Sequence, residues 1–156
     1  MKMQEEFIKK AIEIALENID KGGGPFGALI VKNNEIISSS GNRVTLNNDP
    51  TAHAEIIAIR EASAKLKTWD LSDCVLYTSC EPCPMCLGAV YWAHISRVFY
   101  ACSQSDAGDA GFDDSFIYKE LNLKVSQRKL PMTEINRSEG LSVFKKWNNF
   151  PGKTKY

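Results

Sequence analysis

The first part of the chain carries apolar residues at the spacing of an amphipathic α-helix. Lysine, glutamate and asparagine side chains occupy the opposite side of this pattern. The apolar positions are Phe7, Ile8, Ala11, Ile12, Ala15, Leu16 and Ile19. Residues 22–25 contain three glycines followed by a proline, and this sequence predicts that the helix stops there.

Two runs of strand length follow the first helix. Residues 26–31 form a short apolar run, Asn33 and Asn34 provide a turn, and residues 35–44 return as a second strand. This arrangement predicts a β-hairpin.

The rest of the chain alternates between helical and strand-like patterns. Thr51 is expected to cap a helix whose buried side includes Ile56, Ile59, Ala62 and Leu66. The later elements are expected to be a strand at 74–79, a helix at 85–94, a strand at 97–102, a Gly- and Asp-rich loop at 105–114, a short helix at 115–121 and a last helix at 141–149. Such alternation predicts a single α/β domain, with helices on both faces of a partly parallel sheet.

The composition is that of an ordinary globular domain. The 156 residues fit one domain, and 44% of them are hydrophobic and 24% charged. Nineteen basic and nineteen acidic residues give a formal charge of zero. Proteins that bind nucleic acid usually carry a basic surplus. The balance therefore favours a small-molecule substrate over a nucleic acid, although a local basic patch remains possible.

The cysteines indicate a reducing compartment. The N-terminal residues lack the apolar core of a signal peptide, and no apolar run of about 18 residues is present that could span a membrane. We therefore expect a cytoplasmic protein with reduced thiols and no membrane partner. Three of the five cysteines, Cys80, Cys83 and Cys86, lie within one short segment, and in that setting clustered cysteines favour metal ligation over disulfides.

Two short motifs carry the candidate chemistry, and each lies at the start of an expected helix. The first motif is Thr51-Ala52-His53-Ala54-Glu55, and the second is Cys80-Glu81-Pro82-Cys83-Pro84-Met85-Cys86. The spacing of Cys83 and Cys86 lets both thiolates meet one ion from the first turn of a helix. A helix N-terminus also stabilises a thiolate through its free amides and partial positive charge.

The donor set favours a catalytic zinc site. Three protein ligands, His53, Cys83 and Cys86, leave the fourth tetrahedral position for water, which zinc activates near neutral pH. Glu55 lies two residues beyond His53, so its carboxylate is left to act as general acid and base on that water. One Zn²⁺ per chain is therefore predicted.

Less specific interpretations apply to each motif alone. A Cys-x-x-Cys pair is often a structural zinc knuckle or a redox pair, and a histidine near a helix start is often a cap. A structural four-ligand site would form if Cys80 took the last position, but such a site leaves Glu55 without a role. The conjunction of His-x-Glu with Pro-Cys-x-x-Cys is the signature of zinc deaminases.

Both motifs resemble those of the cytidine and deoxycytidylate deaminase superfamily, in their order and in their separation. The resemblance runs from the first helix to about residue 118. It implies a three-layer α/β/α fold around a mixed, roughly five-stranded sheet, with dimers common.

Within the superfamily, the chain is most similar to the bacterial guanine deaminases. The similarity rests on residues 111–120, on Tyr91-Trp92-Ala93 and on the aromatic end Lys155-Tyr156. It implies hydrolysis of guanine to xanthine and ammonia. Alternative substrates are the adenosine of a transfer RNA, read through a basic rim, and cytosine or a nucleoside.

Five residues are candidates for contact with the base. Guanine presents N1–H and an amine as donors, so its pocket needs a carboxylate, and the resemblance favours Asp114 over Asp113, either of which could instead cap a helix. Asn42 corresponds to an amide that binds base or sugar, or closes a turn. The other candidates are Phe26, Trp92 and Tyr156.

The C-terminal segment, about residues 130–156, is expected to pack on a partner subunit. In similar guanine deaminases this segment crosses to the partner and closes its active site. The resemblance therefore implies a homodimer in which Trp147, Phe150 and Tyr156 contribute to the partner's site, although chain termini are more often frayed.

Overall fold

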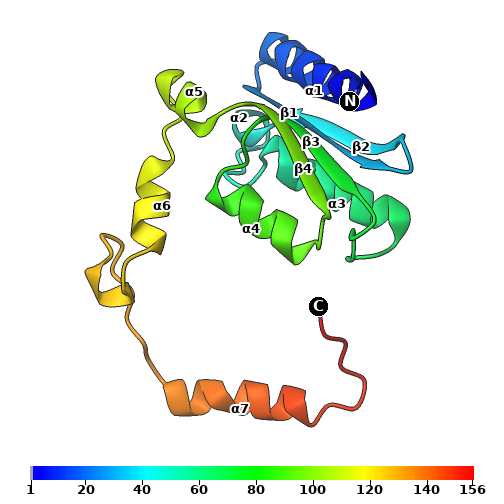
Figure 1. The fold of residues 1–156 in the computed structure, drawn as a ribbon. Coiled ribbons are helices and arrows are strands. Elements are labelled where there is room, and N and C mark those ends of the chain that lie inside the picture. The colour runs from blue at the N-terminus through cyan, green and yellow to red at the C-terminus, as the bar shows by residue number, and fades with distance from the viewer. Residues whose placement is uncertain (1) are drawn as a thin grey trace. The chain divides into compact units, whose positions relative to one another are not determined.

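The computed structural model describes residues 2–156, which divide into two compact units, residues 2–115 and 116–156 (Figure 1). The first unit contains all four strands. Its elements are α1 (Lys2–Asp20), β1 (Gly24–Lys32), β2 (Glu35–Asn42), α2 (Val44–Asn47), α3 (Ala54–Leu66), β3 (Val75–Cys80), α4 (Pro84–Trp92), β4 (Arg97–Cys102) and α5 (Gln104–Asp109).

The sheet of the first unit has the order β2-β1-β3-β4 and is mixed. β1 pairs antiparallel with both β2 and β3, whereas β3 and β4 are parallel and are connected through α4. The expected hairpin and the mixed α/β architecture are therefore confirmed.

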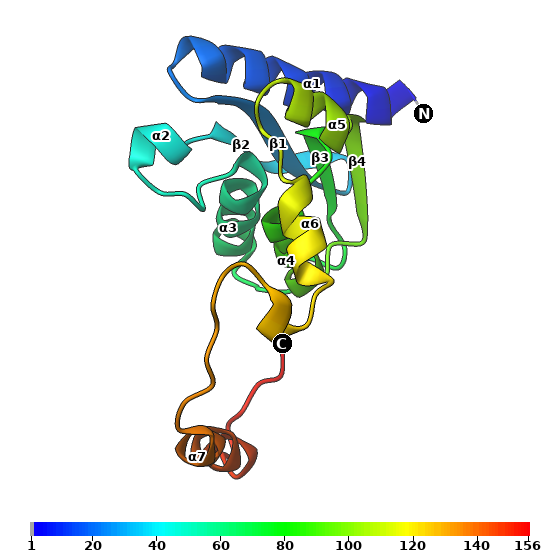
Figure 2. The same cartoon turned by 90° about the vertical axis from the view of Figure 1, so that its left-hand side faces the viewer.

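Alternation along the strands separates two apolar clusters. Ala28 and Ile30 of β1 face α3 and α4, together with Leu76 of β3. Leu29 and Val31 face α1 instead, where they pack with Tyr77. Because successive side chains of a strand point to opposite faces, α1 covers one face of the sheet and α3 and α4 lie side by side on the other (Figure 1, Figure 2). The three-layer prediction is confirmed.

A buried asparagine joins the end of α1 to the edge of the sheet near the later site. The Asn18 amide donates to the carbonyl oxygen of Gly24 at 2.8 Å and to that of Asn42 at 2.7 Å. A Cβ at Gly23 or Gly41 would overlap this side chain, so glycine is required there for close approach. Asn18 thereby fixes the backbone on both sides of the turn that begins β1.

The prediction of roughly five strands is wrong by one for the described residues, which form four. After β4 the chain turns into α5, because Ser103 and Asp106 make a capping box: the Ser103 side chain accepts from the Asp106 backbone amide, and the Asp106 carboxylate accepts from that of Ser103 at 2.7 Å. The segment 105–114, expected to be a loop, therefore contains a helix. Reciprocal capping of this kind satisfies free amides at a helix start.

The expected cap at Thr51 is also wrong. α3 begins at Ala54, and its N-cap is His53. Thr51 instead closes a local turn, in which its backbone amide and hydroxyl both bind Asp49 Oδ1, at 2.8 and 2.7 Å. The helix thus starts later than the capping preference of threonine suggested.

The second unit is helical. It holds most of α6 (Ser115–Leu121), the 3₁₀ turn η1 (Val125–Gln127) and α7 (Arg137–Asn148). No residue of this unit is buried in the described chain. Across residues 2–156, no helix is long and apolar enough to cross a membrane.

Candidate active site

Two helix starts meet in the first unit, and each supplies metal-ligand side chains. His53 is the N-cap of α3 and Cys83 is the N-cap of α4, both in extended conformation. Pro84 occupies the first turn of α4, where its missing N–H costs nothing, and Cys86 follows in the same turn. The partial positive ends of both helices therefore point toward the same place.

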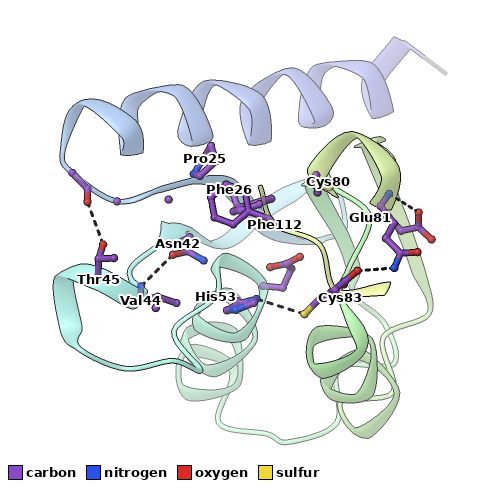
Figure 3. Close-up of a pocket in the computed structure, with 17 residues that line it drawn as sticks. Pro25, Phe26, Asn42, Val44, Thr45, His53, Cys80, Glu81, Cys83 and Phe112 are labelled. Carbon is purple, nitrogen blue, oxygen red and sulfur yellow. Dashed lines mark hydrogen bonds between the residues drawn. The ribbon is translucent and has the colours of Figure 1, made fainter. Parts of the chain in front are cut away.

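The three side chains lie close enough to share one ion. The Sγ atoms of Cys83 and Cys86 are each 3.5 Å from His53 Nδ1. All three ligand atoms lie within 4.8 Å of one another, and Figure 3 shows His53 and Cys83 facing each other. Among the described residues, this is the group of histidine, cysteine and carboxylate side chains with metal-binding geometry.

The two thiols share their protons unequally. Hydrogen bonds from Cys86 first, and then from His53, lower the pKa of Cys83 to about 4 despite its partial burial. The Cys83 sulfur and burial raise the pKa of Cys86, and the hydrogen bond with Cys83 raises the pKa of His53. These contacts favour the thiolate form at Cys83, and a divalent cation would displace the remaining thiol proton on binding.

Glu55 lies directly beside this group and is buried. Its Oε2 accepts from the Cys86 thiol at 3.5 Å, and its Oε1 accepts from Thr78 Oγ1 at 3.4 Å. Burial raises the pKa of Glu55 above its usual range. A carboxyl group that is only 6% exposed and adjacent to three metal-ligand atoms is placed for proton transfer.

The chemistry of the donor set fits zinc. One imidazole and two sulfurs are typical ligands of a tetrahedral Zn²⁺ site that keeps one position open. The surrounding cavity also needs a cation, because its described lining includes Glu55, Glu81, Cys83 and Asp114 but no lysine or arginine. Cys80 does not join the group, since its thiol donates to the carbonyl oxygen of Ser103 at 3.5 Å.

A cavity of about 500 Å³ opens over the metal group. One wall is aromatic: Phe26, at the start of β1, and Phe112, in the loop after α5, meet edge to face with ring centroids 5.0 Å apart (Figure 3). The pair offers an apolar surface of the kind that planar aromatic ligands stack against.

The other walls are polar. Asn42, at the end of β2, is buried, and its Oδ1 accepts from the backbone amide of Val44 at 3.1 Å, which leaves the amide NH₂ to donate to a ligand. Asp114 also lines the cavity, and its Oδ1 accepts from Gln104 Nε2 at 2.6 Å. The cavity thus offers both a donor and an acceptor to a bound molecule.

Comparison with known proteins agrees with this geometry. The family model described as "Cytidine and deoxycytidylate deaminase zinc-binding region" matches residues 1–102. The chain belongs to the cytidine and deoxycytidylate deaminase family. Membership supports zinc as the metal that His53, Cys83 and Cys86 could hold.

Several members of this family are similar over most of their length. A guanine deaminase of Bacillus subtilis is 54% identical over 153 residues, which cover 97% of this chain and 98% of the relative. Its crystal structure matches with a TM-score of 0.95 over the same shares. A structure of the guanine deaminase of Nitrosomonas europaea is 32% identical and matches with a TM-score of 0.66, covering 88% of this chain and 70% of that one.

The similarity extends to deaminases with other substrates. A tRNA-specific adenosine deaminase of Aquifex aeolicus is 40% identical, covering 94% of this chain and 97% of the relative. Membership of the family therefore does not identify the substrate, which has to be inferred from the residues that line the cavity.

The structure brings most, but not all, of the expected site residues of this deaminase together. Phe26, Asn42, His53, Glu55, Cys83 and Asp114 line the cavity, and Cys86 lies against His53 and Glu55. Trp92, at the end of α4, does not line it; this side chain is 65% exposed and borders a separate depression with Trp69 and Ile59. Tyr156 belongs to the second unit, and its contact with a substrate stays a prediction.

Several cavity residues are not indicated by the sequence patterns, among them Glu81, Gln104 and Phe112. Glu81 lies inside the cysteine motif but has no ligand spacing. Phe112 lies in the segment 105–114 that is expected to be a loop, and Gln104 lies just before that segment. The signal that could have found Phe112 is its place two residues before Asp114. Nothing in the local pattern distinguishes Gln104 from a surface residue.

Substitution of the three ligand residues should remove the metal. We expect Cys83→Ser, Cys86→Ser and His53→Ala to lower zinc from about one ion per chain to a small fraction, because a catalytic site has only three protein ligands to lose. Metal analysis after dialysis against a weak chelator measures this. Cys80→Ser is the matched control and should keep its zinc; loss of zinc in that variant would show that the site has a fourth protein ligand.

Proposed function

We propose that the protein hydrolyses guanine to xanthine and ammonia. The observation that carries the proposal is the meeting, in one cavity, of a three-ligand metal group, a buried carboxyl and a second carboxylate on a different wall. The 54% identity to a guanine deaminase over nearly the whole of both chains supports the same conclusion.

The polar walls fit the edges of guanine. Guanine donates from N1–H and from its 2-amino group, and the Asp114 carboxylate would accept from them. Guanine also accepts at O6 and N7, and the Asn42 amide would donate to that edge. Phe26 and Phe112 would contact the planar ring, since each base has a π-face that an aromatic side chain can stack on.

When bound, zinc lowers the pKa of water and so supplies a nucleophile near neutral pH. Glu55 handles the protons of that water. The carboxyl takes one proton and passes it to N3 of guanine, which makes C2 electrophilic and allows a bond from oxygen to C2. Glu55 then moves the second proton to the departing amine, the C2–N bond breaks, and ammonia leaves. One proton of the water stays on N3 of xanthine, so the reaction balances.

The alternative substrates fit the cavity less well. An adenine ring has no proton at N1, so it offers no partner for an Asp114 carboxylate at that edge. A transfer RNA needs lysine or arginine side chains around the pocket to contact its phosphates, and the described lining contains neither. The formal charge of zero agrees with a small-molecule substrate.

A substrate panel tests this proposal. We expect ammonia release from free guanine, and release at least about 100-fold slower from adenine, cytosine, adenosine and an anticodon stem-loop. Glu55→Gln should keep its zinc but lose about 100- to 10,000-fold in kcat, because the proton carrier is absent. Preferred turnover of adenosine in the stem-loop would contradict guanine as the substrate, and a Glu55→Gln variant with wild-type kcat would contradict the role of Glu55.

We also propose that the protein is a homodimer in which the C-terminal segment, about residues 130–156, packs on the partner subunit as part of one deaminase domain. In the described chain the second unit leaves large apolar side chains exposed, among them Leu141, Phe144 and Trp147 of α7. A unit of this size with no buried residue lacks the core that stabilises a folded segment. Extended apolar surfaces of this kind mark interaction sites.

The dimer predicts a solution mass of about twice the 17.4 kDa chain by light scattering. Phe144→Asp should shift the protein toward monomer, because it places a charge on the apolar side of α7. Lys146→Asp, on the same helix, serves as the control and should leave the mass unchanged. A wild-type protein that is monomeric at micromolar concentration would overturn the dimer.

The cytoplasm is the compartment that fits the thiol chemistry. All five cysteines are free, and the metal group depends on two of them as thiolates. Free cysteines persist in reducing compartments. We therefore infer that the protein acts in the cytoplasm.

A further inference from the structure

Asp114 lies in a segment that has little structure of its own. It stands in the loop between α5 and α6, next to Ser115, the last residue of the first unit. A loop carboxylate has rotamer freedom that a strand or helix residue of the site does not have. A precise contact to a base therefore requires something that fixes this side chain.

Gln104 provides that anchor. Its Nε2 donates to Asp114 Oδ1 at 2.6 Å, which engages one carboxylate oxygen and leaves Oδ2 for another donor. An amide that donates has no titratable proton of its own. It therefore orients the carboxylate without neutralising its charge. A lysine or arginine in the same place would neutralise that charge.

Gln104 is itself held by its backbone. As the first residue of α5, its amide N–H donates to Glu81 Oε2 at 3.1 Å, and the Ser103–Asp106 capping box fixes the start of the helix. Glu81 directly follows β3 and lies two residues before the metal-ligand residue Cys83. A chain of contacts thus runs from the cysteine motif through Gln104 to Asp114.

We propose that Gln104 is a positioning residue that sets the purine preference of the site by holding Asp114 as an oriented acceptor. The proposal rests on the proposed function, because it assumes that Asp114 contacts guanine. Gln104 acts through Asp114 and takes no part in proton transfer. Its loss therefore weakens guanine binding more than it slows the chemical steps at Glu55.

The variant Gln104→Met tests the side chain while sparing the helix. Methionine has similar length and no donor, and the backbone amide that binds Glu81 is retained. We expect KM for guanine to rise about tenfold, the effect of losing one hydrogen bond to a charged group, with kcat changed by less than about threefold. The melting temperature should stay at the wild-type value. Asp109→Asn, at the last and exposed position of α5, is the control and should change neither constant.

A double-substitution cycle separates positioning from a structural role. On an Asp114→Ala background, Gln104→Met should cause no further rise in KM, because the group it orients is gone. A purely structural role would instead give the same change on both backgrounds. A second variant, Gln104→Glu, keeps the shape but places like charges together, and should raise KM more than methionine does.

The outcomes distinguish this inference from the proposed function. A wild-type protein without guanine turnover overturns the function, and with it the inference. A wild-type protein that turns over guanine, an Asp114→Ala variant with a raised KM, and a Gln104→Met variant equal to wild type would overturn the inference alone. Additive effects of the two substitutions would overturn it as well.

Discussion

The convergence of two helix N-termini on one point is the constraint from which the rest of the site follows. His53 opens α3 and Cys83 opens α4, and both helices lie on the same face of the sheet. The thiolate sulfurs crowded at this point carry negative charge, and the described lining of the cavity holds no lysine or arginine to balance it. The helix dipoles offset part of that charge, and a divalent cation offsets the remainder.

The two carboxylates of the cavity are suited to different work because their surroundings differ. Glu55 is enclosed on a helix, between Cys86 and Thr78, where burial favours its protonated form. Asp114 stands on a loop, where its Oδ1 accepts a hydrogen bond from the neutral side-chain amide of Gln104. Under the proposed function, this difference in environment lets one cavity combine proton transfer at one carboxyl group with recognition of the base at the other.

Sequence reasoning could predict the features that depend on local pattern. The hairpin, the alternation of strands with helices and the metal group follow from periodicity and from motifs whose spacing matches one turn of a helix. Sequence reasoning failed where a specific side-chain contact, and not the periodic pattern, determines the local structure. The helix at residues 104–109 depends on a capping pair, Ser103 and Asp106, inside a sequence whose glycines and aspartates favour a loop. The fifth strand was expected from the family, and the chain after β4 folds into helices instead.

The residues that line the pocket likewise divide into those that the local sequence pattern predicts and those that depend on how distant segments fold together. Phe112 and Gln104 reach the cavity only because α5 and its following loop fold back toward β1 and β3, an arrangement that no spacing within the segment encodes. The resemblance predicts Trp92 as a substrate contact. In the structure Trp92 lies at the end of α4 and lines a depression on a different surface of the unit. Tyr156 depends on a subunit contact and stays a prediction.

The coordination sphere is the central claim, and X-ray absorption at the zinc edge of the zinc-loaded protein tests it most directly. The account predicts two sulfur neighbours at about 2.3 Å and two nitrogen or oxygen neighbours at about 2.0 Å, one of them exchangeable for solvent or inhibitor. A shell with three sulfurs, or with four protein ligands and no exchangeable position, would contradict it.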